Sequence, residues 1–281
     1  MNNSIIINPN QYIFLEENDH HPDILVGSKR LSLTPKVEQA AKRIGLQLQN
    51  NRQGYIGDIS HQQSIDLLTS INSCNNSIYM AEFLSTLIQG VKGKPVYDGN
   101  KNQIDKKLLE NILSDITEQR GPYRGEWYNT SFTKVNNILQ INYKKFDQKG
   151  NIVSVSEPLD PNTLLEDKLP GIDLDELLNS PTSQGLPTSS ISKGSLYYYH
   201  PRNGSVAGLD ANSDWIVFSC DRYAQNSNSG LGVRPCFSAE GAKFFSETSV
   251  LDSTIQDALN NVRPFEYNDV VYVPVKGIAI K

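Results

Sequence analysis

The amino-acid sequence predicts an α+β fold in which a mostly helical N-terminal region, residues 1–118, precedes a strand-rich region, residues 119–281. Two observations support this division. Up to residue 118, apolar residues recur at spacings of three and four, which places them on one face of a helix. From residue 126 onward, short runs of β-branched and aromatic residues alternate with clusters of Gly, Asn, Ser and Pro, which is typical of strands joined by loops.

The N-terminal region begins with two β-prone segments, residues 4–7 and 12–15, before the helical patterns start. Thr34 then has the position of an N-cap, and Pro35 follows it at the first helical position, where the missing N–H of proline costs nothing. Apolar residues fall on one face over residues 37–48, so the first helix is expected there.

Three more helices are expected before residue 118. Ser60 and Gln63 have the spacing of a capping box, in which each side chain bonds the backbone amide of the other residue, and an apolar stripe follows. Further stripes over residues 80–91 and 108–116 run toward glycines, which commonly end helices. These patterns make the first 118 residues predominantly helical.

The strand-rich region begins with a predicted hairpin. Residues 139–143 alternate between apolar and polar side chains, and a turn at Gly150 precedes the β-prone pair at residues 152–153. Further strands are expected at residues 196–199, 215–220, 232–237 and 270–275, with a helix near residues 253–260.

Composition restricts the possible partners and compartments. The chain has 26 Lys and Arg against 31 Asp and Glu, without a dense basic block, so nucleic acid is not an expected partner. It has neither an apolar run of about 20 residues nor the pattern of a signal peptide, so membrane insertion is not expected. Three widely spaced cysteines do not make a disulfide scaffold. A cytoplasmic or virion-associated protein is expected, and its oligomeric state is left open.

Sequence motifs for metal, cofactor and catalytic sites are weak. Asp210, Asn212 and Asp214 imitate the opening of a calcium loop, but Trp215 occupies the position that needs glycine and Asp221 the position that needs glutamate. The chain contains no glycine-rich phosphate loop, HExxH helix or GxSxG elbow. We therefore expect no metal, no cofactor and no catalytic residues.

A polar tract over residues 203–229 is the main candidate for a binding surface. It interleaves small polar residues with Trp215 and Tyr223, a composition found in antibody paratopes, although a solvated loop around one buried Trp is the alternative. Its alternation predicts an inward face formed by Leu209, Ala211, Ile216, Phe218 and Cys220. The exposed ligand-binding residues are expected to be Gly208, Asp210, Asn212, Asp214, Trp215, Val217, Ser219, Asp221, Arg222, Tyr223, Gln225, Asn226 and Asn228, with Trp215, Arg222 and Tyr223 contributing most of the binding energy.

A series of short motifs in fixed order connects this tract to a known family. The motifs are Met80-Ala81-Glu82-Phe83-Leu84, Pro122-Tyr123-Arg124-Gly125-Glu126-Trp127, Leu165-Glu166-Asp167-Lys168, Pro170-Gly171-Ile172, Thr182-Ser183-Gln184-Gly185-Leu186-Pro187, Leu196-Tyr197-Tyr198-Tyr199, Ser205-Val206-Ala207 and Leu231-Gly232-Val233-Arg234. Together they resemble the variable proteins of archaeal and viral diversity-generating retroelements.

The resemblance implies a C-type lectin fold of the formylglycine-generating-enzyme subtype over residues 119–281. Within it, residues 203–236 would be a variable segment rewritten by adenine-directed mutagenesis of Asn codons, and residues 240–281 a C-terminal extension. Ala211, Ser213, Cys220 and residues 231–234 would be fixed scaffold positions. The implied function is display of a surface that recognises a protein or cell-surface ligand.

Two other functions can be compared with ligand display. An enzyme of the same fold that oxidises a sulfatase cysteine would need a close pair of reactive cysteines, whereas Cys220 and Cys236 lie 16 residues apart without basic neighbours. We therefore do not expect an enzyme. A structural virion or assembly protein, whose helical half docks a larger particle and which has no ligand specificity of its own, is the remaining alternative.

Overall fold

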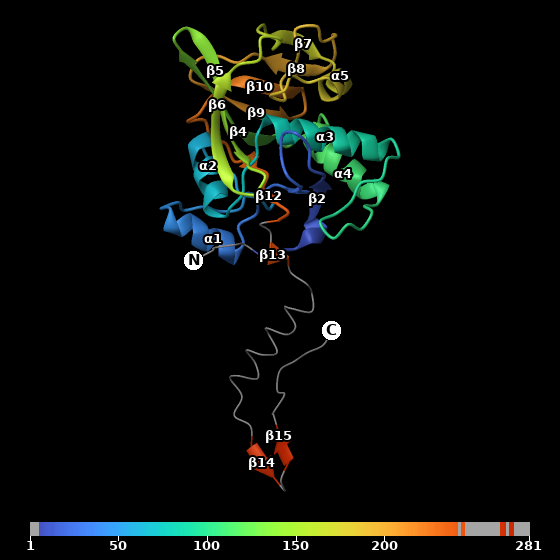
Figure 1. The fold of residues 1–281 in the computed structure, drawn as a ribbon, viewed down its shortest axis with the longest axis vertical. Helices are drawn as coiled ribbons and strands as arrows, with labels where there is room; N and C mark the ends of the chain where they lie inside the picture. Colours follow the sequence, from blue (N-terminus) through green and yellow to red (C-terminus); the bar gives the residue numbers. More distant parts are fainter. Residues whose placement is uncertain (1–5, 241–242, 245–264, 268–269, 273–281) are drawn as a thin grey trace.

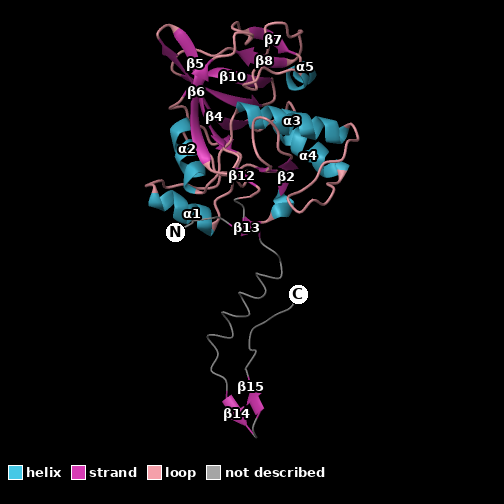
Figure 2. Ribbon diagram, in the orientation of Figure 1, coloured by secondary structure: helices cyan, strands magenta, loops and turns pink. Residues whose placement is uncertain are grey.

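Figure 1 shows the computed structural model, which describes residues 6–240, 243–244, 265–267 and 270–272. The protein has a mixed α+β fold, as predicted, and four of its helices precede a large sheet in the chain (Figure 2). The described helices are α1 (Pro35–Arg43), α2 (His61–Ser70), α3 (Ser77–Val91), α4 (Lys106–Thr117), α5 (Leu174–Asn179) and the short 3-10 helix η1 (Pro9–Gln11).

The large sheet is formed by eight strands that follow residue 118. In chain order they are β4 (Arg124–Val135), β5 (Ile138–Phe146), β6 (Ile152–Pro158), β7 (Lys168–Ile172), β8 (Leu196–Tyr199), β9 (Ser205–Ala211), β10 (Ile216–Tyr223) and β11 (Leu231–Val233). Their spatial order is β6-β5-β4-β9-β10-β8-β7, and β11 pairs with β4. The β10–β8 and β11–β4 pairs are parallel and the other pairs are antiparallel.

A second sheet joins a hairpin that precedes α1 to a strand that follows the large sheet. Strands β2 (Tyr12–Leu15) and β3 (Ile24–Gly27) form an antiparallel pair, and β12 (Cys236–Ser238) pairs with the other edge of β3. Two shorter pairs complete the described strands: β1 (Ile6–Ile7) with β13 (Lys243–Phe244), and β14 (Phe265–Tyr267) with β15 (Val270–Tyr272).

The predicted helix caps form as the sequence indicates. The Thr34 hydroxyl accepts a hydrogen bond from the amide of Val37 at 3.4 Å, and both bonds of the Ser60–Gln63 capping box are present. These side chains satisfy amides that a helix start would otherwise leave unpaired. The hairpin predicted around Gly150 is also present as β5 and β6.

Two hydrophobic clusters lie on opposite faces of β4. Tyr128 points toward α3 and packs in the cluster that contains Phe83 and Phe218, whereas its neighbour Trp127 belongs to a cluster with Leu67 of α2. Successive side chains of a strand point to opposite faces, which explains this separation. In Figure 1, α3 accordingly runs along the sheet beside β4 and β9. Both clusters contain residues from either side of residue 118.

Several elements differ from the expectations. Strands β3, β4 and β7 and helix α5 were not predicted. The single strand expected at residues 232–237 is two strands, β11 and β12, and the helix expected over residues 37–48 ends at Arg43. The strand expected at residues 270–275 is described only as Val270–Tyr272. The helix expected near residues 253–260 lies outside the described residues. In the described part of the chain, no helix has the length and apolar character needed to cross a bilayer.

Candidate functional site

The outer face of the large sheet is the candidate binding surface, and we define it by the paired positions Tyr197, Gly208, Asp210, Val217 and Ser219. Val217 pairs in register with both Asp210 and Tyr197, and Ser219 pairs with Gly208. Directly paired residues share one face of a sheet, so the strands β8, β9 and β10 present these five residues together.

The opposite face of these strands is the predicted scaffold. Ala211 and Cys220 are fully buried, and Leu209 and Phe218 are buried beside them. Ile216 is half-buried and packs against the same cluster. The inward half of the predicted alternation is therefore confirmed.

The expectation that the whole outer face is solvent-exposed is wrong. Gly208, Asp210, Val217 and Ser219 are all buried. Their direction agrees with the predicted alternation, but larger neighbouring side chains lie over part of this face. The Arg222 Cδ atom, for example, lies 3.5 Å from the position that a Cβ atom on Gly208 would occupy.

An ion pair between Asp210 and Arg222 organises the outer face. The Tyr123 hydroxyl donates to the other Asp210 carboxylate oxygen at 2.9 Å, and the Arg222 guanidinium lies 5.6 Å from the centre of the Trp127 ring. A register shift between Ser219 and Arg222 brings the arginine onto this face. Only 14% of the Arg222 side chain is exposed, so it is less available to a ligand than predicted.

The exposed part of the predicted surface lies at the ends of β10. Trp215 is 40% exposed and Tyr223 is 74% exposed. The Trp215 ring stacks on Tyr197 with centroids 6.4 Å apart, which holds this indole at the surface. The other exposed members of the predicted set are Asp214, Gln225, Asn226 and Asn228, and the half-buried ones are Asn212 and Asp221.

The loop after β10, residues 224–230, is held in place by its main-chain carbonyl groups. Each of four carbonyl oxygens accepts a hydrogen bond from the segment of residues 51–61. The bonds run from His61 N to Ala224 O (3.1 Å), from Asp58 N to Asn228 O (2.9 Å), from Asn51 Nδ2 to Ser229 O (2.5 Å) and from Tyr55 Oη to Gly230 O (2.9 Å). Gly57 permits this approach, because a Cβ atom there would lie 2.1 Å from the Ser229 carbonyl oxygen.

A buried ion pair fixes the chain directly after this loop. Arg234 is fully buried, and its Nη2 and Nε atoms lie 2.5 Å and 3.0 Å from the two carboxylate oxygens of Glu126. Burial alone would raise the pKa of Glu126, but the charges of Arg234 and Arg30 outweigh it and hold that pKa below its ordinary value. Glu126 is therefore a carboxylate at neutral pH.

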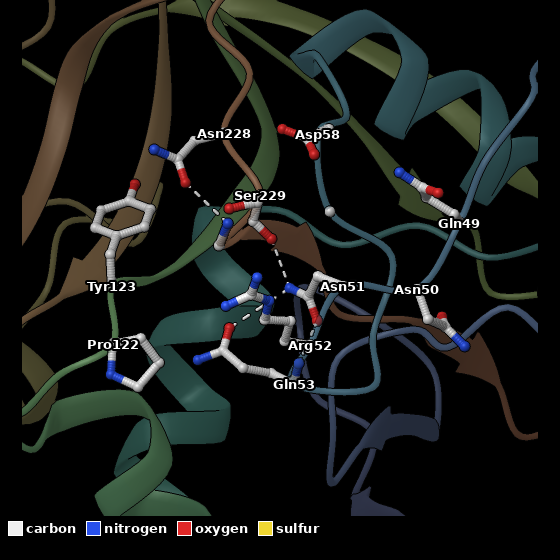
Figure 3. A pocket seen from close by; sticks show the side chains of 12 residues that line it. Gln49, Asn50, Asn51, Arg52, Gln53, Asp58, Pro122, Tyr123, Asn228 and Ser229 are labelled. Atoms are coloured by element: carbon white, nitrogen blue, oxygen red, sulfur yellow. Dashed lines mark hydrogen bonds between the residues drawn. The ribbon is translucent and has the colours of Figure 1, made fainter.

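A groove of about 670 Å³, lined mainly by polar residues, lies between residues 49–58 and residues 228–230 and was not predicted (Figure 3). Its lining residues are Gln49, Asn50, Asn51, Arg52, Gln53, Gly57, Asp58, Pro122, Tyr123, Asn228, Ser229 and Gly230. The run of five polar residues from Gln49 to Gln53 was a signal in the sequence, but nothing in it indicated the opposite wall.

The described cysteines are buried, and the first residue of the calcium-like loop takes part in an ion pair. Cys220 is a free, buried thiol, and burial raises its pKa well above the ordinary value. Asp210 is engaged by Arg222 and Tyr123. Among the residues that the structure describes, no group of three or more His, Cys, Asp or Glu side chains could hold a metal ion.

Comparison with known proteins gives no relative for this chain. No protein-family model matches it, and neither the curated proteins nor the solved structures contain a match.

Proposed function

We propose that the chain is a ligand-binding display protein with a C-type lectin fold of the formylglycine-generating-enzyme subtype. In this proposal residues 203–236 form a variable segment that a diversity-generating retroelement rewrites, and the surface of this segment recognises a protein or cell-surface ligand.

The main-chain attachment of residues 224–230 is the observation that carries the proposal. All four bonds from residues 51–61 end on backbone carbonyl oxygens, which every amino acid possesses. Gln225 and Asn226 are exposed, so replacing their side chains removes none of these four bonds. A loop held in this way keeps its path while its side chains change, as a diversified surface requires.

Exposed aromatic side chains supply the binding energy in this proposal. Tyr and Trp give large contact areas at a low cost in conformational entropy and are enriched among interface hot spots. Trp215 is already held by its stack on Tyr197, so little of its freedom remains to be lost on binding. Tyr223 lies at the other end of the same strand.

Asp210 and Arg222, which the sequence indicated as ligand-binding residues, belong to the scaffold in this proposal. Because they neutralise each other in a poorly solvated position, changing one alone leaves a charge without its partner. The residues that remain candidates for the variable surface are Asn212, Asp214, Trp215, Asp221, Tyr223, Gln225, Asn226 and Asn228. The side chains of Asn212 and Asn228 also accept hydrogen bonds from nearby backbone amides.

The test is binding of the full chain to surface extracts of candidate host cells, with and without a chelator. We expect the W215A/Y223A variant to lose affinity by at least tenfold, since interface hot spots contribute about 2 kcal/mol or more each. The matched control is V135A/I138A, which truncates two exposed apolar residues beside the β4–β5 turn. The chelator should have no effect, because Asp210 is occupied by Arg222.

Three results would contradict the proposal. Full affinity in W215A/Y223A would place the ligand elsewhere, and chelator-sensitive binding would indicate a metal-dependent site. Binding to other particle components, with none to host surfaces, would instead favour a structural assembly role.

A further inference from the structure

We propose that the groove between residues 49–58 and residues 228–230 binds a neutral oligosaccharide. This inference deepens the proposed function and rests on it, because Asn228 and Ser229 belong to the segment 203–236. It specifies the class of ligand, and it adds to the binding site a second wall formed by residues 49–58, which lie far from residues 228–230 in the sequence.

The walls of the groove come from three segments that hydrogen bonds hold together. In the view of Figure 3, Pro122 and Tyr123 lie on one side, Gln49 lies on the other, and Asn51 reaches Ser229 between them. The Tyr123 hydroxyl is held by Asp210, so this wall is joined to the outer face of the sheet. The volume of about 670 Å³ lies within the range of roughly 300 to 1,000 Å³ that is usual for small-molecule sites.

Polar side chains without protein partners line this groove. Gln49, Arg52 and Asp58 are exposed, and in the described part of the chain their side chains form no hydrogen bond or ion pair with other residues. The side-chain carbonyl oxygen of Asn228 accepts from Gly230 N at 2.8 Å, and its side-chain amide nitrogen has no partner among the described residues. The Ser229 hydroxyl is likewise without a partner among the described residues.

This set of groups matches the hydroxyl groups of a sugar. Each hydroxyl both donates and accepts, and amide and hydroxyl side chains such as those of Gln49 and Ser229 can do the same. Arg52 adds donors and Asp58 adds acceptors, while the flat ring of Tyr123 offers a surface for the C–H face of a pyranose. The groove thus presents donors and acceptors together with apolar surface.

Other ligand classes fit the groove less well. Among its lining residues Arg52 is the single cation and Asp58 the single carboxylate, so a polyanion such as nucleic acid meets no net positive charge. Protein partners usually insert apolar or aromatic residues into desolvated pockets, and here only Pro122 and Tyr123 could receive them. A neutral, polyhydroxylated ligand is the class that remains.

The experiment measures binding of the full chain to an array of neutral, sialylated and sulfated oligosaccharides, followed by calorimetry with the neutral oligosaccharide that binds best. The groove variant is Q49A/R52A, and the matched control is Q47A/R43A, which removes the same two residue types at exposed positions outside the groove. A second groove variant, D58N, keeps the size of the side chain at a residue with a φ of 53°, where Asn is well tolerated.

We expect wild type and Q47A/R43A to bind the same neutral oligosaccharide with dissociation constants within twofold of each other. Q49A/R52A should bind it at least tenfold more weakly, and D58N should weaken it in the same direction. Failure to bind any neutral oligosaccharide at millimolar concentration would overturn the inference, as would a preference for acidic ones or unchanged binding in Q49A/R52A.

The W215A/Y223A variant separates this inference from the proposed function. Sugar binding that survives in W215A/Y223A and is lost in Q49A/R52A supports the groove, whatever the result with host surface extracts. Sugar binding that W215A/Y223A loses and Q49A/R52A keeps would overturn the groove and leave the outer surface as the ligand site.

Discussion

Replacement of Asp210 by alanine tests the corrected view of the outer face. Asp210 is 4% exposed, forms the ion pair with Arg222 and accepts a hydrogen bond from the Tyr123 hydroxyl at 2.9 Å. Removing one partner of a fully buried ion pair costs about 3 to 5 kcal/mol. The Arg222 side chain keeps 14% exposure and can turn partly toward water, so we expect Asp210→Ala to lower the free energy of unfolding by about 2 to 3 kcal/mol.

Urea unfolding monitored by tryptophan fluorescence measures this loss, since Trp127 is fully buried beside the arginine. Asp214→Ala is the matched control, because Asp214 is an exposed residue of the adjacent turn. Its free energy of unfolding should change by less than about 0.5 kcal/mol. The double variant D210A/R222A should be less destabilised than the sum of the two single variants by about 1 to 2 kcal/mol.

Two results would refute this reasoning. A change below about 0.5 kcal/mol in Asp210→Ala would mean that the carboxylate is solvated, as the sequence first indicated. Strict additivity of Asp210→Ala and Arg222→Ala would mean that the two side chains do not stabilise each other.

Three further predictions concern the scaffold. Burial lowers the pKa of His61 to about 4, so the unfolded chain binds the proton more tightly than the folded chain does. The free energy of unfolding should therefore be highest above pH 6.5, fall as the pH falls toward 4, and be lower by about 2 kcal/mol at pH 5. A His61→Gln variant that keeps the wild-type pH profile would contradict this. Val233→Ala should cost on the order of 1 to 3 kcal/mol in a urea titration because Val233 is fully buried, and a cost as small as that of Asp214→Ala would disagree. Arg124 donates hydrogen bonds to the main-chain carbonyl oxygens of Asp115, Glu118, Arg120 and Pro122. Arg124→Lys should lower the midpoint of thermal unfolding, because a single ammonium group cannot reproduce the planar set of donors of a guanidinium. An unchanged midpoint would argue against this role.

Local signals in the sequence predicted the four α-helices that precede residue 118. The caps at Thr34 and Ser60 depend on side chains within three residues of each other, so the pattern alone reveals them. Strand β3 gave no such signal because all four of its residues are buried, and a strand covered on both faces lacks the alternation of apolar and polar positions. The short strand β7 is likewise irregular in register, with a shift between Lys168 and Ile172.

The sequence predicted the face of the sheet on which each residue of the candidate site lies, but not how exposed its side chain is. Alternation placed Asp210 and Ala211 on opposite faces, as the structure has them. It could not show that Arg222 lies over this face, because that contact depends on a register shift within β10. The groove could not be predicted from local patterns, because Asn51 and Ser229 are 178 residues apart in the chain and only the complete fold brings them together.

The second sheet has a consequence for synthesis of the chain. Its central strand β3 needs β12 as a neighbour, and Arg234, just before β12, bonds the Gly27 carbonyl oxygen 207 residues away in sequence. At about 5 to 20 residues per second, translation leaves the apolar β2–β3 hairpin without this partner for about 10 to 40 s. An unpaired strand edge exposed for that time can pair with other chains. The β2–β3 hairpin therefore gains its third strand only after residue 238 has left the ribosome.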